Sequence, residues 1–322
     1  MSTSPAAAPS RQLPRAGREF AVVFVIMLVV VAVAPFVAYP FFVMQALCFA
    51  LFACAFNLLI GYVGLLSFGH AMFLGLASYV CAHAAKVWGL DPVLAILTGV
   101  ASSALLGLIA GALSIRSQGI YFAMITVALS QMIFFFCVEA PFTHGEDGIQ
   151  AVPQGFAFGL IDLSRPLALY SFTAAIFLFG FLAIYRTVNS PFGEILKAIR
   201  ENEARAISLG YRVARYKLTA FVLSASLAGL AGATKAIVVQ NASLTDVGFA
   251  MSGEVVLMTL LGGMGTLYGP VVGALVVVSM QNYLAQYGEW VTVIQGAVFI
   301  ACVLVFRRGV VGEIANALKW SI

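Results

Sequence analysis

The chain has 322 residues, of which 62% are hydrophobic and only 9% are charged, and its formal net charge is +4. Soluble domains carry roughly 25% charged residues, so this composition excludes an ordinary soluble globular protein. The basic residues do not alternate with aromatic residues along one face, which argues against a nucleic-acid-binding protein. Apolar runs of about 20 residues, each long enough to cross a bilayer as a helix, recur along the chain. We therefore expect an all-α polytopic integral membrane protein.

The first segment, residues 1–19, mixes prolines with serines, alanines and arginines. This composition predicts a disordered cytoplasmic tail. An apolar run starts at Phe20, and the small residues 32–34 resemble a signal-peptidase site, so a cleaved secretory signal is the alternative interpretation. More apolar runs follow instead of an exported domain, which favours a membrane span.

Ten candidate spans follow the tail in chain order. They are residues 20–39, 41–62, 68–85, 92–115, 119–138, 167–185, 218–239, 251–262, 269–287 and 290–306. Two are doubtful as complete crossings, because 68–85 starts in a glycine-rich stretch and 251–262 is too short for a hydrocarbon core of about 30 Å. We therefore expect eight to ten transmembrane helices, some broken or short, in a permease domain of residues 20–306.

The basic residues set the predicted orientation. With a cytoplasmic N-terminus and ten crossings, fourteen of the 17 lysines and arginines lie in cytoplasmic segments. The opposite orientation would invert this bias, against the positive-inside rule. Residues 186–217 and the tail 307–322 are therefore predicted to be cytoplasmic, and the loop 139–166 to be exterior.

No pattern typical of catalysis occurs in the chain. No lysine follows a glycine, which excludes a P-loop, and the three histidines lack the spacing of metal ligands. The five cysteines all lie in apolar runs without a C-x-x-C pair. We expect no catalytic residues, no metal and no cofactor.

The loop 186–217 carries the signals of two short helices. Ser190 followed by Pro191 is typical of a helix start, as is Asn202 before the second segment. Gly210 stands where a helix commonly ends in a left-handed residue. These residues predict a compact helix–turn–helix outside the membrane. A solvated linker that satisfies the positive-inside rule is the alternative.

Five segments, in order along the chain, resemble those of a known family. They are G-Y-V-G to S-F-G-H at 61–70, T-H-G-E-D-G-I at 143–149, A-I-R-E-N-E-A-R-A-I-S-L-G-Y at 198–211, K-L-T-A-F to A-G-L-A-G-A at 217–233, and G-G-M-G-T to G-P at 262–270. From about residue 40 to 310 the chain resembles the permeases of branched-chain amino acid ABC importers, and specifically their LivM-type subunit. One departure is Arg308, where the family usually shows a proline before the glycine at Gly309.

The resemblance implies that the loop 186–217 holds a coupling helix seated on a cytoplasmic ATPase. Carried over by position, its docking face would comprise Glu203, Ala204, Ile207, Leu209 and Gly210. Ion pairs at the rim of that contact would involve Arg200, Glu201 and Arg205.

The implied partners are a second permease subunit of the LivH type, two ATPase subunits and a periplasmic or tethered substrate-binding protein. A homodimer of permeases is the less expected arrangement. The implied location is a bacterial cytoplasmic (inner) membrane, and no nucleic acid is involved.

Polar and glycine residues within the spans are candidates for the translocation path. They are Asn57, Ser67, His70, Gln131, Gly262, Gly263 and Gly265. The alternative for the polar ones is packing or hydrogen bonding between helices. The glycine row 265, 269 and 273 predicts close helix contact, either internal or with a second permease. Lys235 and Glu254, near the exterior ends of their spans, are expected to snorkel.

The exterior loop offers a candidate contact for the binding protein at Thr143, Glu146 and Asp147, with a solvated connector as the alternative. Together these features indicate a permease subunit of an ATP-driven importer for branched-chain or related amino acids. Urea, short amides and aromatic acids are alternative solutes within the same family. A stand-alone secondary transporter or channel would be expected to bury ionisable residues in mid-span, and the sequence places none there with certainty.

Overall fold

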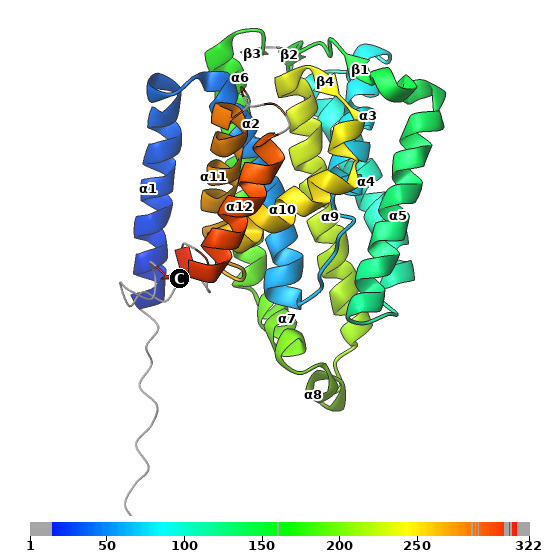
Figure 1. Cartoon of the computed structure of the whole chain (residues 1–322), viewed down its shortest axis with the longest axis vertical. Helices are drawn as coiled ribbons and strands as arrows, with labels where there is room; N and C mark the ends of the chain where they lie inside the picture. The colour runs from blue at the N-terminus through cyan, green and yellow to red at the C-terminus, as the bar shows by residue number, and fades with distance from the viewer. Residues whose placement is uncertain are drawn as a thin grey trace, which may run out of the picture.

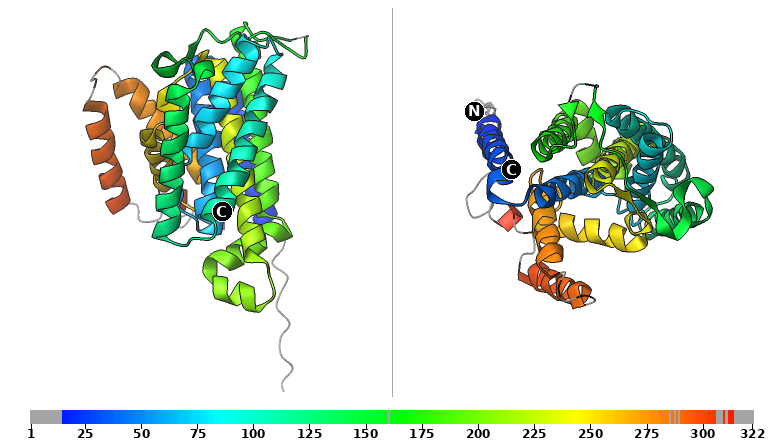
Figure 2. Two further views of the ribbon diagram at one scale, coloured as in Figure 1. Left: turned by 90° about the vertical axis from the view of Figure 1, so that its right-hand side faces the viewer. Right: turned by 90° about the horizontal axis from the view of Figure 1, so that it is seen from above.

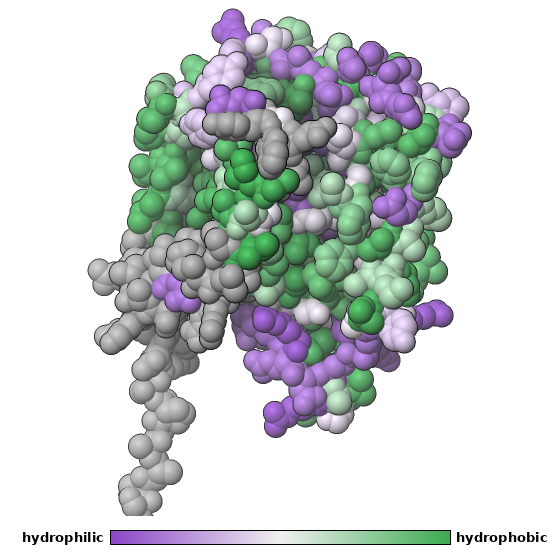
Figure 3. Space-filling view, in the orientation of Figure 1, coloured by the Kyte–Doolittle hydropathy of each residue, from purple (hydrophilic) through white to green (hydrophobic). Residues whose placement is uncertain are grey.

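The computed structural model describes residues 15–159, 161–284, 286, 288, 290–305, 309 and 311–313. Over this part the chain is a helical bundle with an apolar belt between two more polar ends (Figure 1, Figure 3). The helices are α1 Arg15–Val37, α2 Pro40–Asn57, the π-helix η1 Leu58–Val63, α3 Ala71–Lys86, α4 Pro92–Ser114, α5 Ile120–Glu139, α6 Pro166–Val188, α7 Pro191–Glu201, α8 Glu203–Ser208, α9 Val213–Val239, α10 Phe249–Gly262, α11 Gly269–Leu284 and α12 Trp290–Val305. This architecture confirms the predicted all-α polytopic membrane fold.

Each of the ten predicted spans coincides with a described helix, in the same order. Five segments, namely α2 with η1, α4, α5, α6 and α9, are long and apolar enough to cross a membrane by themselves. The first helix begins at Arg15, so residues 15–19 of the expected tail are helical. Residues 1–14, 306–308 and 314–322, which include most of both expected tails, lie outside the described part of the chain.

Helices α2 and α9 form the centre of the bundle. The apolar stretch of α2 with η1 is 89% buried and that of α9 is 72% buried, against 33% for α4 and 28% for α5. Small residues of α9 allow close contact with its neighbours: Gly229 packs on Ser103 of α4, whose hydroxyl donates to the Ala225 carbonyl at 2.7 Å. Membrane helices gain their packing energy from such close approach, because lipid offers no hydrophobic driving force between them.

Two segments depart from simple crossing helices. The chain returns from η1 into the bundle as irregular backbone, so α3 starts only at Ala71 (Figure 1). Seen from above, α10 lies lengthwise while its neighbours are seen end-on, so it crosses the bundle obliquely (Figure 2). These are the two spans predicted to be incomplete.

The backbone of the irregular segment is satisfied by side chains of other helices. The Phe68 amide donates to Thr126 Oγ1 of α5 at 3.3 Å, and the Ala71 amide donates to Ser252 Oγ of α10 at 3.0 Å. Non-helical backbone is tolerated at membrane depth only where protein or water provides such partners. The contacts fix the start of α3 to α5 and α10.

Short strands and turns cover the end of the bundle remote from α7 and α8 (Figure 1). They are β1 Ile149–Gln150, β2 Phe156–Ala157, β3 Ile161–Asp162 and β4 Asn241–Ala242, with the turns η2 Pro141–Thr143, η3 Gly145–Asp147 and η4 Leu244–Asp246. β1 pairs antiparallel with β4, and β2 pairs antiparallel with β3. The first pairing ties the loop after α5 to the end of α9.

A buried ion pair joins α9 to η4. Lys235 and Asp246, 8% and 2% exposed, are bonded to each other, and the Lys235 ammonium lies 5.1 Å from the centre of the Phe49 ring. The expectation that Lys235 snorkels to the surface is therefore wrong. Its partner is eleven residues ahead, beyond the end of the helix, where the hydropathy pattern carries no information on pairing.

Replacement of either partner alone, Lys235→Met or Asp246→Leu, leaves an unpaired charge in the protein interior. We expect each to lower the free energy of unfolding by about 3–5 kcal/mol. The double replacement removes both charges and should cost much less than the sum. Denaturant titration of the purified protein in detergent measures the three values, and additive losses would contradict the pairing.

Candidate functional site

A pair of short helices projects from the bundle as the arm, which we define as residues 190–211: α7, α8 and the turn that ends α8. It projects from the end of the bundle at which α1 begins (Figure 1). Its sequence differs from the rest of the chain, with both signs of charge and few long apolar runs. An element of this kind needs local signals to fold, because most of it lies outside the bundle.

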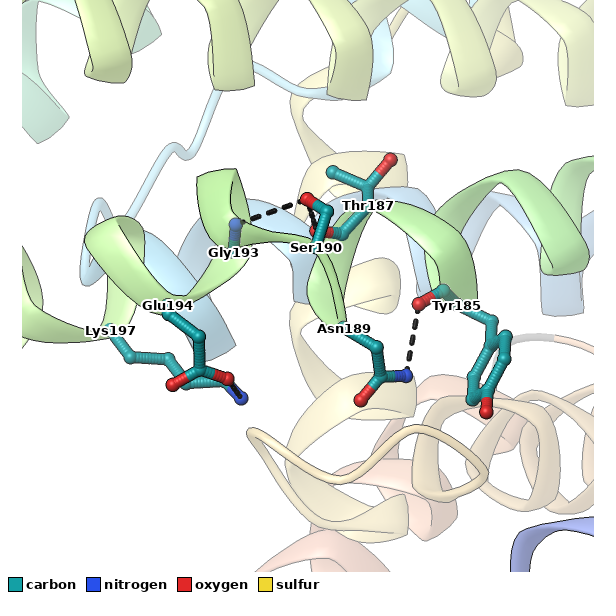
Figure 4. A network of polar contacts seen from close by, with 7 residues as sticks. All are labelled: Tyr185, Thr187, Asn189, Ser190, Gly193, Glu194 and Lys197. Atoms are coloured by element: carbon teal, nitrogen blue, oxygen red, sulfur yellow. Dashed lines mark hydrogen bonds and ion pairs between the residues drawn. The ribbon is translucent and has the colours of Figure 1, made fainter. Parts of the chain in front are cut away.

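The start of α7 is held by a cap. Ser190 Oγ accepts a hydrogen bond from the Gly193 amide at 3.4 Å and donates to the Thr187 carbonyl at 2.7 Å (Figure 4). The hydroxyl thereby links the last turn of α6 to the first turn of α7. Lys197 and Glu194 form an exposed ion pair of 2.9 Å on the next turn. The predicted helix start at Ser190 and Pro191 is confirmed.

The second helix, α8, is capped at both ends. Asn202 Oδ1 accepts from the Arg205 amide at 3.0 Å, as predicted. At the other end the Gly210 amide donates to the Ile207 carbonyl at 2.9 Å, and the Tyr211 amide donates to the Ala206 carbonyl at 3.2 Å. This is the Schellman pattern, and the φ of Gly210 is +87°. The arm is therefore a folded element and not a solvated linker.

A small apolar cluster fastens the arm to the foot of α9. Ile199, Ala206 and Val213 are buried together, and Ile195 and Tyr216 pack against them. The cluster holds α7 and α8 in one orientation relative to the bundle.

Glu203 adds a polar attachment. Its carboxylate lies 2.8 Å from Lys217 Nζ of α9 and accepts from Gln118 Nε2 at 3.2 Å. The side chain of Lys217 is nearly buried. Glu203 was expected on the outward docking face, but its carboxylate contacts the bundle. The sequence could not reveal this, because Gln118 is 85 positions away.

The remaining residues of the expected docking face do lie on the surface. Ile207 and Leu209 are 57% and 70% exposed, and Ala204 and Gly210 are exposed beside them. Tyr211, which was not among the expected residues, is also exposed at 41%. Its position after the glycine of a Schellman cap was the signal that could have identified it, since that position commonly carries an apolar contact residue. These five residues form the tip patch, framed by the exposed charges of Glu201 and Arg205.

Arg200 was expected to form an ion pair at the rim of this surface. Its side chain is exposed, and its guanidinium donates to the Gly61 carbonyl in the last turn of η1. Its side chain also runs along Gly64, where an added Cβ would lie 3.2 Å from Arg200 Cγ. Arg200 therefore connects the arm to the interior of the bundle.

Next to this contact lies the α10–α11 turn, which we define as residues 263–268. Asn57 of α2 binds it with both groups of its amide: Nδ2 donates to the Thr266 carbonyl at 2.8 Å, and Oδ1 accepts from the Gly265 amide at 2.9 Å. Asn57 is only 2% exposed. The structure thus brings together Asn57, Gly263 and Gly265, which had been expected along the translocation path.

The glycine row mediates an internal contact. A Cβ on Gly262 would lie 1.9 Å from the Gly269 carbonyl oxygen, and one on Gly273 would lie 1.8 Å from that of Met258. Helices α10 and α11 therefore approach each other at backbone distance. Of the two alternatives left open by the sequence, the structure supports the internal one at these positions.

The other expected path residues lie elsewhere. His70 is fully buried among the rings of Phe52, Phe56 and Phe73, with centroids 5.3–5.8 Å away, and its Nε2 lies 3.1 Å from Ser224 Oγ. Ser67 is also fully buried, and Gln131 is half-buried on α5. The surroundings of His70 are those of a packing residue in an aromatic core.

At the opposite end of the bundle, Thr143 does not lie on the surface as expected. Its hydroxyl is buried and lies 2.6 Å from the Cys137 and Ala140 carbonyls, which closes the end of α5. Glu146 and Asp147 are exposed on η3. Only these two acids of the expected binding-protein contact are accessible.

Comparison with known proteins gives the family. The family model described as branched-chain amino acid transport system / permease component matches residues 38–303. The high-affinity branched-chain amino acid permease LivM of Salmonella typhimurium is 26% identical, with 92% of this chain and 76% of that protein covered. The LivM protein of Escherichia coli is 25% identical over the same shares.

A further relative, matched over less of the chain, is named for a different solute. The ribose import permease RbsC of Bacillus subtilis is 27% identical, with 69% of this chain and 70% of that protein covered. No solved structure matches. Since the family model spans most of the chain, from α2 into α12, this multi-pass membrane protein belongs to the branched-chain amino acid transport permease family.

Proposed function

We propose that this chain is one permease subunit of an ATP-binding-cassette importer and forms half of a translocation path for branched-chain or related amino acids. Separate cytoplasmic ATPase subunits drive transport, and the chain itself catalyses no reaction. The observation that carries the proposal is the arm. Its two short helices are held by caps at the start of α7 and at both ends of α8, and its exposed apolar tip patch lies at one end of a membrane bundle. The two LivM relatives, named as high-affinity branched-chain amino acid permeases, support the solute class.

The arm has the properties that a force-bearing contact requires. Its tip patch offers Ile207, Leu209 and Tyr211 to a partner groove, and buried apolar and aromatic side chains carry most of the energy of such contacts. Its caps and the Glu203–Lys217 ion pair keep it rigid relative to α9. A partner that moves the tip patch would therefore move the foot of α9 as well.

The other partners follow from the same assembly. Only about a third of the residues in the apolar stretches of α4 and α5 are buried within the chain, which leaves faces for lipid and for a second permease subunit, proposed to be of the LivH type. Glu146 and Asp147 lie at the end remote from the arm, on the side proposed to meet a periplasmic or tethered substrate-binding protein. In this arrangement both termini and the arm face the cytoplasm of a bacterial inner membrane.

A specific observation supports each of two alternatives, one for the solute and one for the class of transporter. One relative is named as a ribose import permease, which supports a different solute class within similar sequences. Urea, short amides and aromatic acids, implied by the family resemblance, are the alternative solutes. The buried Lys235–Asp246 pair is the kind of feature expected of a secondary transporter. Its two charges bind each other at the end of α9, which gives it a structural use without ion coupling.

The tip patch can be tested by Leu209→Asp. A charge at the centre of an apolar contact should weaken ATPase binding by at least about 30-fold, the effect of a typical interface hot spot. Copurification of the ATPase subunits with the tagged permease measures the loss. Lys197→Ala, which removes an exposed ion pair of the same arm, serves as the matched control and should leave copurification unchanged. If ATPase subunits never accompany the unaltered protein, the importer proposal fails.

The turn that ends α8 can be tested by Gly210→Val. The φ of +87° is unfavourable for a β-branched residue, at a cost of roughly 1–2 kcal/mol, so the tip patch should lose its fixed geometry. We expect solute uptake to fall while ATP hydrolysis continues. Gly89→Val introduces the same strain at φ +63° in an open turn at the other end. Equal uptake by the two variants would contradict a role of the arm in coupling.

A further inference from the structure

We propose that Arg200 and Asn57 act as positioning residues that carry movement of the arm to the α10–α11 turn, and through it to α10. The inference rests on the proposed coupling function. It adds the route inside the chain, from the arm through the end of η1 to the turn. Each step of this route is a specific polar contact between segments far apart in the sequence.

The first step joins α7 to η1. Gly61 lies in the last turn of η1, where carbonyl groups have no partner further along the helix. The Arg200 guanidinium supplies the partner, in a charge-assisted bond between residues 139 positions apart. Gly64, at φ +80°, turns the chain back beside the same side chain. Movement of α7 therefore pulls directly on the end of η1.

The second step joins α2 and η1 to the turn. Both hydrogen-bonding groups of the Asn57 amide are used on the turn, one on Gly265 and one on Thr266. Gly61 itself packs on the turn, since an added Cβ there would lie 2.8 Å from the Gly265 nitrogen. A Cβ on Gly265 would in turn lie 3.3 Å from Arg200 Nη1. Arm, η1 and turn thus meet at a single point.

The third step runs from the turn into the bundle. The turn is the direct continuation of α10, whose Ser252 accepts the Ala71 amide at the start of α3. At its other face the turn touches the segment beyond α12, where a Cβ on Gly309 would lie 2.4 Å from Gly263 Cα. A shift of the turn would therefore reach α3, α10 and Gly309 together. Of these, α3 is the interrupted segment of the bundle and α10 is the oblique one.

If this route operates, ATP binding by the ATPase subunits should change the accessibility of the α10–α11 turn only when Arg200 is present. Met264 of the turn is 46% exposed, so Met264→Cys provides a labelling site for a water-soluble maleimide. The four described native cysteines are buried, and Cys302→Ala removes the remaining one. The complete importer, reconstituted in proteoliposomes, is labelled with and without ATP, Mg²⁺ and vanadate, and its ATP hydrolysis is measured in the same preparation.

With Arg200 in place, the nucleotide should change the labelling rate by several-fold, because closure of the ATPases shifts the population of turn conformations. With Arg200→Ala this several-fold response should be lost, because the charge-assisted hydrogen bond that joins the arm to η1 is removed. ATPase content and the rate of hydrolysis should stay within about twofold, since the tip patch is untouched. Arg200→Lys should restore part of the response. Asn57→Ala should also abolish the labelling response. The double variant Asn57→Ala/Arg200→Ala should lose no more of the response than either single variant.

The matched control is Arg186→Ala, which removes a positive charge from the exposed last turn of α6, at the same end of the bundle. It should leave the labelling response unchanged. An unaltered response in Arg200→Ala, or no response in the complex that retains Arg200, would overturn the inference. A response that falls only in proportion to ATPase content would also overturn it, because Arg200 would then serve assembly alone. Absence of ATPase subunits from the unaltered complex would instead reject the proposed function itself.

Discussion

The structure depends on one constraint: backbone polar groups inside a membrane must find partners within the protein. Continuous helices satisfy this constraint with their own hydrogen bonds. At the breaks in the described bundle, side chains of other segments provide the partners. Asn57 satisfies the turn at 263–268, Arg200 satisfies the end of η1, and Thr126 and Ser252 satisfy the return into α3. The breaks are therefore specific, and each is attached to a named neighbour.

This arrangement has a mechanical consequence. An unbroken helix transmits force along its own axis, whereas a break held by a few hydrogen bonds can take up two arrangements at small cost. Two of these breaks, the end of η1 and the turn at 263–268, lie next to one another and beside Arg200 of the arm. The caps make the arm rigid, and the arm lies against a region that can rearrange. This combination suits a permease subunit that is driven by separate ATPase subunits. The buried Lys235–Asp246 pair lies near the opposite end and holds α9 against η4.

Much of the fold and of the arm could be predicted from sequence, because the relevant signals are local. Hydropathy predicted ten apolar segments that each coincide with a described helix, and the caps at Ser190, Asn202 and Gly210 depend on residues within a few positions. The pairings of Arg200 with Gly61 and of Glu203 with Lys217 and Gln118 join separate elements. No periodicity or spacing encodes such contacts. The sequence therefore predicts both Arg200 and Glu203 at the docking surface of the arm, whereas in the structure their side chains also bind the bundle.

The proposed function requires that the tip patch bind an ATPase subunit. Site-specific crosslinking tests it most directly: a cysteine-reactive photocrosslinker is attached at Ile207→Cys in the intact membrane complex, and at Phe158→Cys near β2, at the opposite end of the bundle, for comparison. The account predicts that the first position crosslinks to an ATPase subunit and the second does not. Crosslinking of an ATPase subunit from Phe158→Cys, or its absence from Ile207→Cys in a complex that contains ATPase, would contradict the account.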